Sequence, residues 1–348
     1  MARLFLIVLV GTYITRLQAN EPVSRDEGFP QSVLVVVGAE GTADYGKEFQ
    51  TWTERWQQAA ISSGAEFRFI GGAQSVPLDG TTASRPAVAE EDSDLAALEV
   101  AIRQSGQQQT SEPLWLVLIG HGTFDSRTAR FNLRGPDLEA QQLAEWCRDL
   151  KRPLALINCS SCSAPFLNVL SGSNRVIITA TKDGNQIQYS RFGDAMSKAI
   201  NGLEADINRD GQTSLLEAWL YASRRTADFY VAEGRLATEH SLLDDNGDAQ
   251  GSRVELFAGD RPRDDIKDTS LVDGRQAGRW HLVRSAEEQQ LTVSEREQRV
   301  QLEQQLESLR ARRSEFDEAA YLKQLEAAAL PLAQLYQAVE MRQKQSQP

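Results

Sequence analysis

Cysteine, histidine and aromatic side chains are scarce in this chain of 348 residues. It contains three cysteines and three histidines, and only 7% of its residues are aromatic. Three cysteines are too few for a scaffold held by disulfides, so a hydrophobic core must hold the chain together. A hydrophobic share of 41% and a charged share of 25% are typical of a globular protein, and the length suits one large domain plus a smaller element.

An excess of positive charge is also missing. Asp and Glu together number 49 against 37 Lys and Arg, and the formal net charge is −12. This balance argues against a nucleic-acid partner, because nothing in the chain would neutralise a row of phosphates. An acidic surface is compatible with an exported protein or with divalent cations, and by itself it decides neither.

Long apolar runs are absent beyond the start of the chain. Arg3 precedes an apolar run from Leu4 to Val10, and Leu17-Gln18-Ala19 then resembles a signal-peptidase site. The run is too short to cross a bilayer core of ~30 Å. We therefore expect residues 1–19 to be a signal peptide cleaved near Ala19, followed by a leader over 20–31, and export to the periplasm or the medium. An uncleaved N-terminal anchor is the alternative.

Apolar runs and helical patterns alternate through the middle of the chain. Strands are expected at 32–38, 65–70, 114–120, 153–157 and 175–180, and helices at 49–60, 95–102 and 137–150. This order predicts an α/β domain over residues 32–258, with a mostly parallel sheet covered by helices on both faces.

The last part of the chain has a different pattern. Residues 259–285 are polar and rich in Asp and Arg, which is typical of a linker. Residues 286–345 predict a helical hairpin that starts at a capping box formed by Ser294 and Glu297 and is broken or kinked near Pro331. We expect this hairpin to pack on the domain or to associate with another copy. Its heptads are too few for a long coiled coil.

Two candidate catalytic groups follow neighbouring buried strands. His121 is the only histidine that follows such a strand and precedes a glycine, Gly122, while Cys159 and Cys162 follow the next strand. Ligands of open α/β sheets bind at the carboxyl ends of the strands. A thiol peptidase needs an imidazole beside its thiolate and backbone N–H donors for the oxyanion, and a glycine lets such a donor approach the substrate.

These motifs resemble the caspase–legumain–gingipain group (clan CD) of cysteine peptidases over roughly residues 32–257. The strand end Gly120-His121-Gly122 and the strand end Asn158-Cys159-Ser160-Ser161-Cys162 carry the resemblance. It implies a caspase–haemoglobinase fold and a peptide or protein substrate cleaved through an acyl-enzyme. His121 would act as general base and acid, with the N–H groups of Gly122 and residue 160 as oxyanion donors.

Two further segments indicate which branch of that group the chain resembles most. The strand from Arg175 to Thr181, followed by Tyr189, resembles the legumain strand that borders the specificity pocket. The Gly-His-Gly-Thr motif and Gly135-Pro136-Asp137 make the chain look closest to bacterial legumain-like members.

The identity of the nucleophile stays open. Anchoring the family pattern on Ile157 and Phe166 places Ser160 at the nucleophile position, with Cys159 and Cys162 on either side. Cys159 would act after a shift of one residue, and Cys162 from the following turn. Alternatively the site is inactive, with the two cysteines as core residues or as a disulfide. Two functions therefore stand: an exported cysteine endopeptidase, or an inactive pseudoenzyme serving as a calcium-binding scaffold or interaction module.

Residues 206–217 match the calcium loop of an EF-hand. The expected ligands are Asp206, Asn208, Asp210, Gln212, Ser214 and Glu217. Alternate side chains would supply oxygen atoms, Gly211 would permit the sharp turn, and Glu217 would close the shell with both carboxylate oxygens. We expect structural rather than catalytic Ca²⁺, because the loop has no histidine. The alternative is an Asx-rich turn that caps a helix. A second acidic cluster, Asp244 to Asp248, is interpreted as a polar turn.

Overall fold

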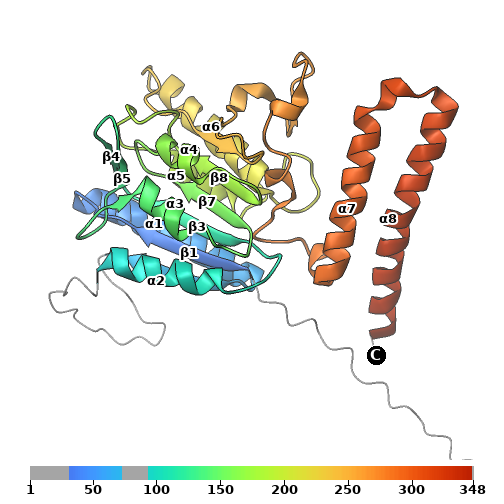
Figure 1. Cartoon of the computed structure of the whole chain (residues 1–348), viewed down its shortest axis with the longest axis horizontal. Helices are drawn as coiled ribbons and strands as arrows, with labels where there is room; N and C mark the ends of the chain where they lie inside the picture. The colour runs from blue at the N-terminus through green and yellow to red at the C-terminus, as the bar shows by residue number, and fades with distance from the viewer. Residues whose placement is uncertain (1–30, 73–92, 347–348) are drawn as a thin grey trace, which may run out of the picture.

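The computed structural model describes residues 31–72 and 93–346 (Figure 1). The expected signal peptide and almost all of the expected leader lie outside these residues. In the described part of the chain, no helix is long and apolar enough to cross a membrane.

A six-stranded sheet forms the centre of the protein, in the order β2-β1-β3-β7-β8-β9. The strands are β1 (Ser32–Val37), β2 (Glu66–Gly71), β3 (Leu114–Ile119), β7 (Leu154–Asn158), β8 (Arg175–Thr179) and β9 (Leu242–Asp244). All neighbours pair in parallel except β8 and β9, which are antiparallel. The predicted α/β class with a mostly parallel sheet is confirmed.

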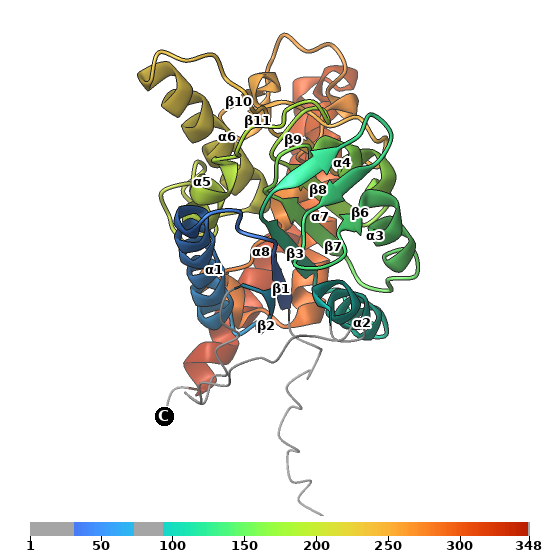
Figure 2. The same cartoon turned by 90° about the vertical axis from the view of Figure 1, so that its left-hand side faces the viewer.

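Helices cover both faces of the sheet (Figure 2). On one face lie α1 (Ala43–Ser63), α5 (Phe192–Ala199) and α6 (Leu215–Ala232), and on the other α2 (Asp94–Gly106), α3 (Ala140–Trp146) and α4 (Ala164–Leu170). Successive residues of β1 alternate between the two cores: Val33 and Val35 join the first, Leu34 and Val36 the second. A parallel strand covered on both sides needs apolar residues at every position, which explains its unbroken apolar sequence.

Helix α1, which contains the helix predicted over 49–60, buries one apolar face. Phe49, Trp52 and Trp56 are each at most 2% exposed, at the spacing that places side chains on one face of a helix. Thr42 caps the start of the helix, where its hydroxyl accepts a hydrogen bond from the Tyr45 N–H, and Gly64, with a φ of +70°, caps its end. This left-handed conformation suits glycine because it has no Cβ.

The segment expected as a polar linker packs against the domain instead. Val272, Ala277 and Leu282 within 259–285 are buried in the same core as α1. The segment also holds short elements: strand β11 (Arg261–Pro262) and 3₁₀ turns η3 (Thr269–Leu271) and η4 (Ala277–Arg279). Just before it lie turn η2 (Val254–Leu256) and strand β10 (Phe257–Ala258), which pairs with β11. The apolar residues of this segment are widely spaced among many charged ones, so the sequence has no helix or strand periodicity that would predict its packing.

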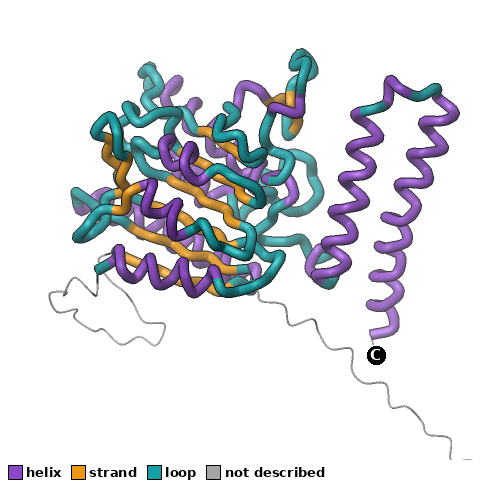
Figure 3. The backbone as a smooth tube through the Cα atoms, in the orientation of Figure 1, coloured by secondary structure: helices purple, strands orange, loops and turns teal. Residues whose placement is uncertain are grey.

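The C-terminal helical hairpin is present, as α7 (Val293–Ala311) and α8 (Glu318–Ser346) side by side (Figure 3). Turns η5 (Glu288–Gln290) and η6 (Arg313–Glu315) precede and join them. The capping box is formed by Thr292 and Glu295 rather than by Ser294 and Glu297. Helix α8 continues through Pro331.

Candidate functional site

His121 lies just beyond the carboxyl end of β3, among aromatic rings. Its ring centroid is 5.1 Å from that of Tyr45, 5.5 Å from Phe49 and 6.0 Å from Tyr189. Its Nε2 is 3.2 Å from the Glu40 carbonyl oxygen, at the end of β1. The side chain is partly exposed. The structure therefore places His121 where a strand-end site was predicted, held by aromatic packing and a backbone oxygen.

Cys159 is part of the core rather than of an accessible site. It is 1% exposed, and its N–H continues the sheet by donating to the Leu118 carbonyl at 2.9 Å. A Cβ on Gly193 would lie only 3.0 Å from the Cys159 Cβ, so α5 covers this thiol closely. Burial, with a contribution from the charge of Glu239, raises the pKa of the thiol well above its ordinary range. Such a thiol is inert.

Ser160, at the family's nucleophile position, is also buried. Its exposed fraction is 0%, and its hydroxyl donates to Asn158 Oδ1 at 2.7 Å. The Ser160 N–H, one of the two expected oxyanion donors, bonds the same oxygen at 3.0 Å. Both groups are therefore engaged within the turn that follows β7.

Ser161 connects the two strand ends, a role that no sequence motif predicted. Its hydroxyl donates to the Gly122 carbonyl and accepts from the Gly122 N–H, both at 3.1 Å. The second expected oxyanion donor is therefore engaged as well. A Cβ at position 122 would lie 2.2 Å from the Ser161 carbonyl oxygen, so this close approach requires glycine. The short strand β4 (Gly122–Phe124) then pairs with β5 (Ala129–Phe131), which pairs with β6 (Leu138–Glu139).

Cys162 differs from the other two candidates in its backbone. Its φ is +54°, a left-handed conformation that is uncommon outside glycine and often found at functional sites. The residue is 1% exposed, and its Sγ lies 3.9 Å from the Gln186 carbonyl oxygen. Burial raises the pKa of this thiol, while the neighbouring Ser161 side chain lowers it. All three cysteines carry free thiols, so the disulfide alternative is not formed.

Within the described residues, neither thiol nor the Ser160 hydroxyl hydrogen-bonds His121. All five candidate site residues lie at the carboxyl edge of the sheet: His121, Gly122, Cys159, Ser160 and Cys162. They do not form a catalytic pair of nucleophile and histidine.

Tyr189 forms the wall beside His121, and a buried carboxylate holds its segment. The Tyr189 ring stacks on Tyr45 at 4.3 Å. Glu239 accepts bonds from Ser190 Oγ at 2.7 Å and from the Arg191 N–H at 3.0 Å. Burial raises the pKa of Glu239, and these hydrogen bonds lower it. Glu239 belongs to no motif, so nothing in the sequence pointed to it.

A cavity of about 690 Å³ is lined by Tyr189, Trp52 and residues of α5 and α6. The Arg191 guanidinium, which also lines it, lies 4.2 Å from the centroid of the Phe229 ring. This volume is within the range of small-ligand and peptide side-chain pockets.

The expected calcium loop folds as a turn in which most side-chain acceptors bind N–H groups of the loop itself, while Gln212 Oε1 accepts from the Ser285 N–H at 3.1 Å. Asp206 Oδ1 accepts from Arg209 and Asp210 at 2.7 and 3.2 Å, and its Oδ2 accepts from Gly211 at 3.0 Å. Gly211 has φ of +83°, as the template requires. Among the described residues, no three His, Cys, Asp or Glu side chains are grouped so that they could hold a metal ion.

Glu217, the twelfth residue of the loop, is 1% exposed and caps α6. It forms a capping box with Ser214, and its Oε1 accepts from the Ile207 and Asn208 N–H groups at 2.9 and 3.1 Å. Among the remaining expected ligands, Asp210 Oδ1 accepts from the Gln212 N–H at 3.1 Å.

The second acidic cluster is a buried junction between two turns. Asp273 accepts bonds from the N–H groups of Asp245, Asn246 and Ser252 at 2.9–3.1 Å. The Asp245 carboxylate in turn accepts hydrogen bonds of 2.7–2.9 Å from three N–H groups of the second turn, those of Gly274, Gln276 and Ala277. The interpretation of this cluster as a polar turn agrees with these bonds. Burial raises the pKa of Asp273 to about 7.

No protein-family model matches the chain, and no curated protein matches it. Among solved structures, it is similar to the initiator caspase Dronc of Drosophila, with 14% identity, a TM-score of 0.41, and coverage of 72% of this chain and 96% of that one. It is also similar to caspase-1 of Spodoptera frugiperda, with 12% identity, a TM-score of 0.38, and coverage of 66% and 92%. Neither likeness is close enough to assign a function. The narrower likeness to bacterial legumain-like proteins stays a prediction.

The buried Asp273 predicts an unusual dependence of stability on pH. The folded protein holds this proton up to pH about 7, whereas an unfolded chain releases it near its ordinary pKa of about 3.9. Because the folded state binds more protons between these values, the free energy of unfolding should fall as pH rises through this window, by roughly 2–4 kcal/mol. Urea unfolding at a series of pH values measures this.

Asp273→Asn is the matched variant, since it cannot titrate. Its stability should vary less across the same window than that of the wild type. An equal fall in both proteins would show that other groups cause the dependence.

Proposed function

We propose that the α/β domain binds peptide segments at the carboxyl edge of its sheet and does not cleave them. The observation that carries this proposal is the burial of Cys159, Ser160 and Cys162, whose side chains form no hydrogen bond to His121 in the described part of the chain. In this proposal the domain is an inactive relative of the caspase-like cysteine peptidases.

The chemistry of a thiol peptidase explains why this observation matters. The attacking group must be a thiolate, and a nearby imidazole normally stabilises it. Burial raises the pKa of both Cys159 and Cys162 and so favours the neutral thiols. The N–H groups of Ser160 and Gly122 already have acceptors at 3.0 and 3.1 Å, so the tetrahedral oxyanion would lack free donors.

Peptide binding is supported by the surface that remains. Tyr45, His121 and Tyr189 are each partly exposed and form one aromatic cluster. Arg191 adds a guanidinium that stacks on Phe229 beside the 690 Å³ cavity. Tyrosine and arginine are the residue types that often dominate binding energy in protein interfaces.

A cysteine endopeptidase that uses Cys162 is the second candidate. Its left-handed backbone and the neighbouring Ser161 side chain, which lowers the pKa of its thiol, favour it over Cys159. In this account the Cys162 thiol transfers its proton to His121, and its sulfur attacks the substrate carbonyl. The imidazolium then protonates the leaving amine, and water hydrolyses the acyl-enzyme. A rearrangement of the 160–162 turn would have to precede these steps.

Structural calcium is a further proposal, because the loop keeps the template's backbone and oxygen-bearing side chains. Asp206 Oδ2 accepts a single N–H and keeps a lone pair for a cation. Asp206 Oδ1 and both Glu217 oxygens each accept two hydrogen bonds, some of which a bound cation would have to replace. When bound, Ca²⁺ would fix the turn that leads into α6. Export also stays a prediction, since the residues that indicate it lie outside the described part of the chain.

The binding proposal predicts affinity without turnover. A fluorogenic peptide library should show no hydrolysis above that of His121→Ala, because no thiol is paired with the imidazole. Peptides that bind, identified by fluorescence anisotropy, should bind Tyr189→Ala roughly 10-fold more weakly, since a central aromatic contact is removed. Tyr336→Ala, on α8, is the control and should bind normally. Turnover that disappears in both His121→Ala and Cys162→Ala would favour the endopeptidase instead.

The calcium proposal predicts thermal stabilisation. At a Ca²⁺ concentration of about 100 times Kd, binding to the folded state alone adds about 2.7 kcal/mol, so Tm should rise in Ca²⁺ relative to a chelator. Glu217→Gln should lower Tm in both conditions because it weakens the cap, and it should abolish the difference between them. An unchanged wild-type Tm at millimolar Ca²⁺ would contradict the proposal.

A further inference from the structure

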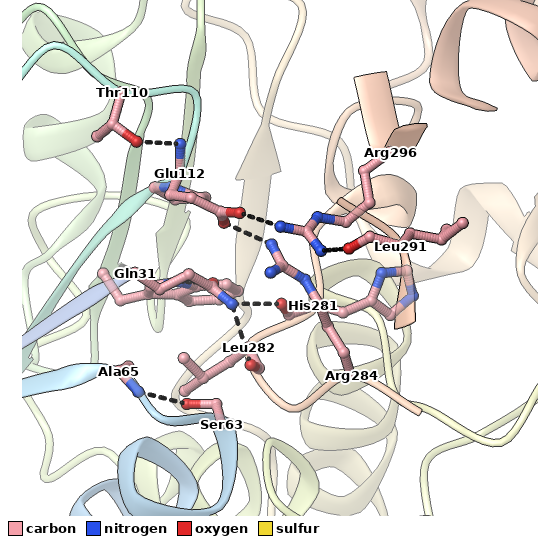
Figure 4. Close-up of polar contacts among 12 residues, drawn as sticks. Gln31, Ser63, Ala65, Thr110, Glu112, His281, Leu282, Arg284, Leu291 and Arg296 are labelled. Carbon is pink, nitrogen blue, oxygen red and sulfur yellow. Dashed lines mark hydrogen bonds and ion pairs between the residues drawn. The ribbon is translucent and has the colours of Figure 1, made fainter. Parts of the chain in front are cut away.

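A second cavity lies at the opposite end of the sheet from His121, where the domain meets α7. It has a volume of about 460 Å³, and its lining includes Gln31, Glu112 and Pro113, which precede β1 and β3. Gln31 anchors the facing segment, because its Nε2 donates to the carbonyls of His281 and Leu282, both at 3.2 Å (Figure 4). The cavity is therefore walled by parts of the chain that are held in place.

Positive charge exceeds negative charge in this cavity. Its lining holds four arginines and three glutamates: Arg279, Arg284, Arg296, Arg299, Glu112, Glu288 and Glu297. The Glu112 carboxylate forms ion pairs with both Arg284 and Arg296, as Figure 4 shows. An excess of positive charge is unexpected in a chain of net charge −12, so it reflects this site and not the general surface.

Burial makes this excess costly. Arg299 is 7% exposed and pairs with Glu288 at 2.6 Å, so three inner guanidiniums share the two buried carboxylates. Glu303 forms a longer ion pair with Arg299, 3.8 Å from its Nε, but it lies outside the lining and beyond hydrogen-bond distance. The groups that line the cavity carry one more positive than negative charge, which a bound anion would offset.

Three buried nitrogens in the lining have no hydrogen-bond partner: Nε2 of Gln276, Nε2 of His281 and Nε of Arg299. His281 and Arg299 are the most buried of these residues, at 8% and 7% exposed. The other His281 nitrogen bonds the backbone of Arg279, and burial lowers the pKa of the ring to about 3. The ring is therefore neutral, and its Nε2 can accept a hydrogen bond, whereas Arg299 Nε can donate one.

We propose that this cavity binds a phosphate group, as inorganic phosphate or a phosphomonoester. Such a group carries negative charge and acceptor oxygens for the arginines. Because its second pKa is about 6, it also keeps a proton part of the time at neutral pH and can donate it to His281 Nε2. Sulfate and carboxylate have the charge but no proton to donate. The cavity volume leaves room for an organic substituent beside Trp280.

The test is isothermal titration of the full chain with inorganic phosphate, and with sulfate at the same ionic strength. Phosphate should bind saturably and sulfate about 10-fold more weakly, because only phosphate satisfies His281. Arg284→Gln should weaken phosphate binding roughly 10-fold or more by removing a charged donor. Arg103→Gln, which removes the same charge from an exposed pair on α2, is the control and should bind as the wild type does.

His281→Gln should reduce the preference for phosphate over sulfate, and circular dichroism should show that it is folded. If it does not fold, the less buried Arg284→Gln still decides the question. Phenyl phosphate distinguishes the two possible ligands. If it binds more tightly than inorganic phosphate, the ligand is a phosphomonoester; if it binds more weakly, the ligand is free phosphate. No saturable phosphate binding, or equal loss in Arg284→Gln and Arg103→Gln, would overturn the proposal.

Discussion

The contact between the ends of β3 and β7 decides what the strand-end site can do. Ser161 bonds both backbone groups of Gly122, and Cys159 continues the sheet through Leu118. These bonds fix the turn after β7 so that its thiols and hydroxyls are buried, while His121 faces the aromatic cluster of α1. The same contact that holds the two strand ends together therefore separates the histidine from the groups it would need for catalysis.

The helices over this face reinforce that separation. Trp52 and Cys159 both pack against Gly193, where even one Cβ would meet the Trp52 ring at 2.5 Å. Glu239 holds the start of α5 and the segment that carries Tyr189. A rigid aromatic wall beside a cavity is a good surface for binding, and it leaves little freedom for the turn at Cys162 to approach His121.

Most of the strands and helices, and the placement of the candidate residues just after β3 and β7, could be predicted from the sequence, because buried parallel strands and the Gly-His-Gly motif have strong local signals. The state of the site could not, since burial of Cys159 depends on Gly193, and the engagement of Gly122 depends on Ser161. Neither contact has a sequence pattern. The segment 259–285 was also misjudged, because three isolated apolar residues bury it. The arginine cavity joins residues as distant as Glu112 and Arg296, which no local motif connects.

The central claim is that no thiolate–imidazolium pair forms at the end of β7. The most direct measurement is the rate at which iodoacetamide alkylates Cys162 in the native protein, followed by mass spectrometry from mildly acidic to alkaline pH. The account predicts slow alkylation that increases only at alkaline pH and is the same in His121→Ala. Rapid alkylation at neutral pH that is lost in His121→Ala would contradict it and establish an active thiol.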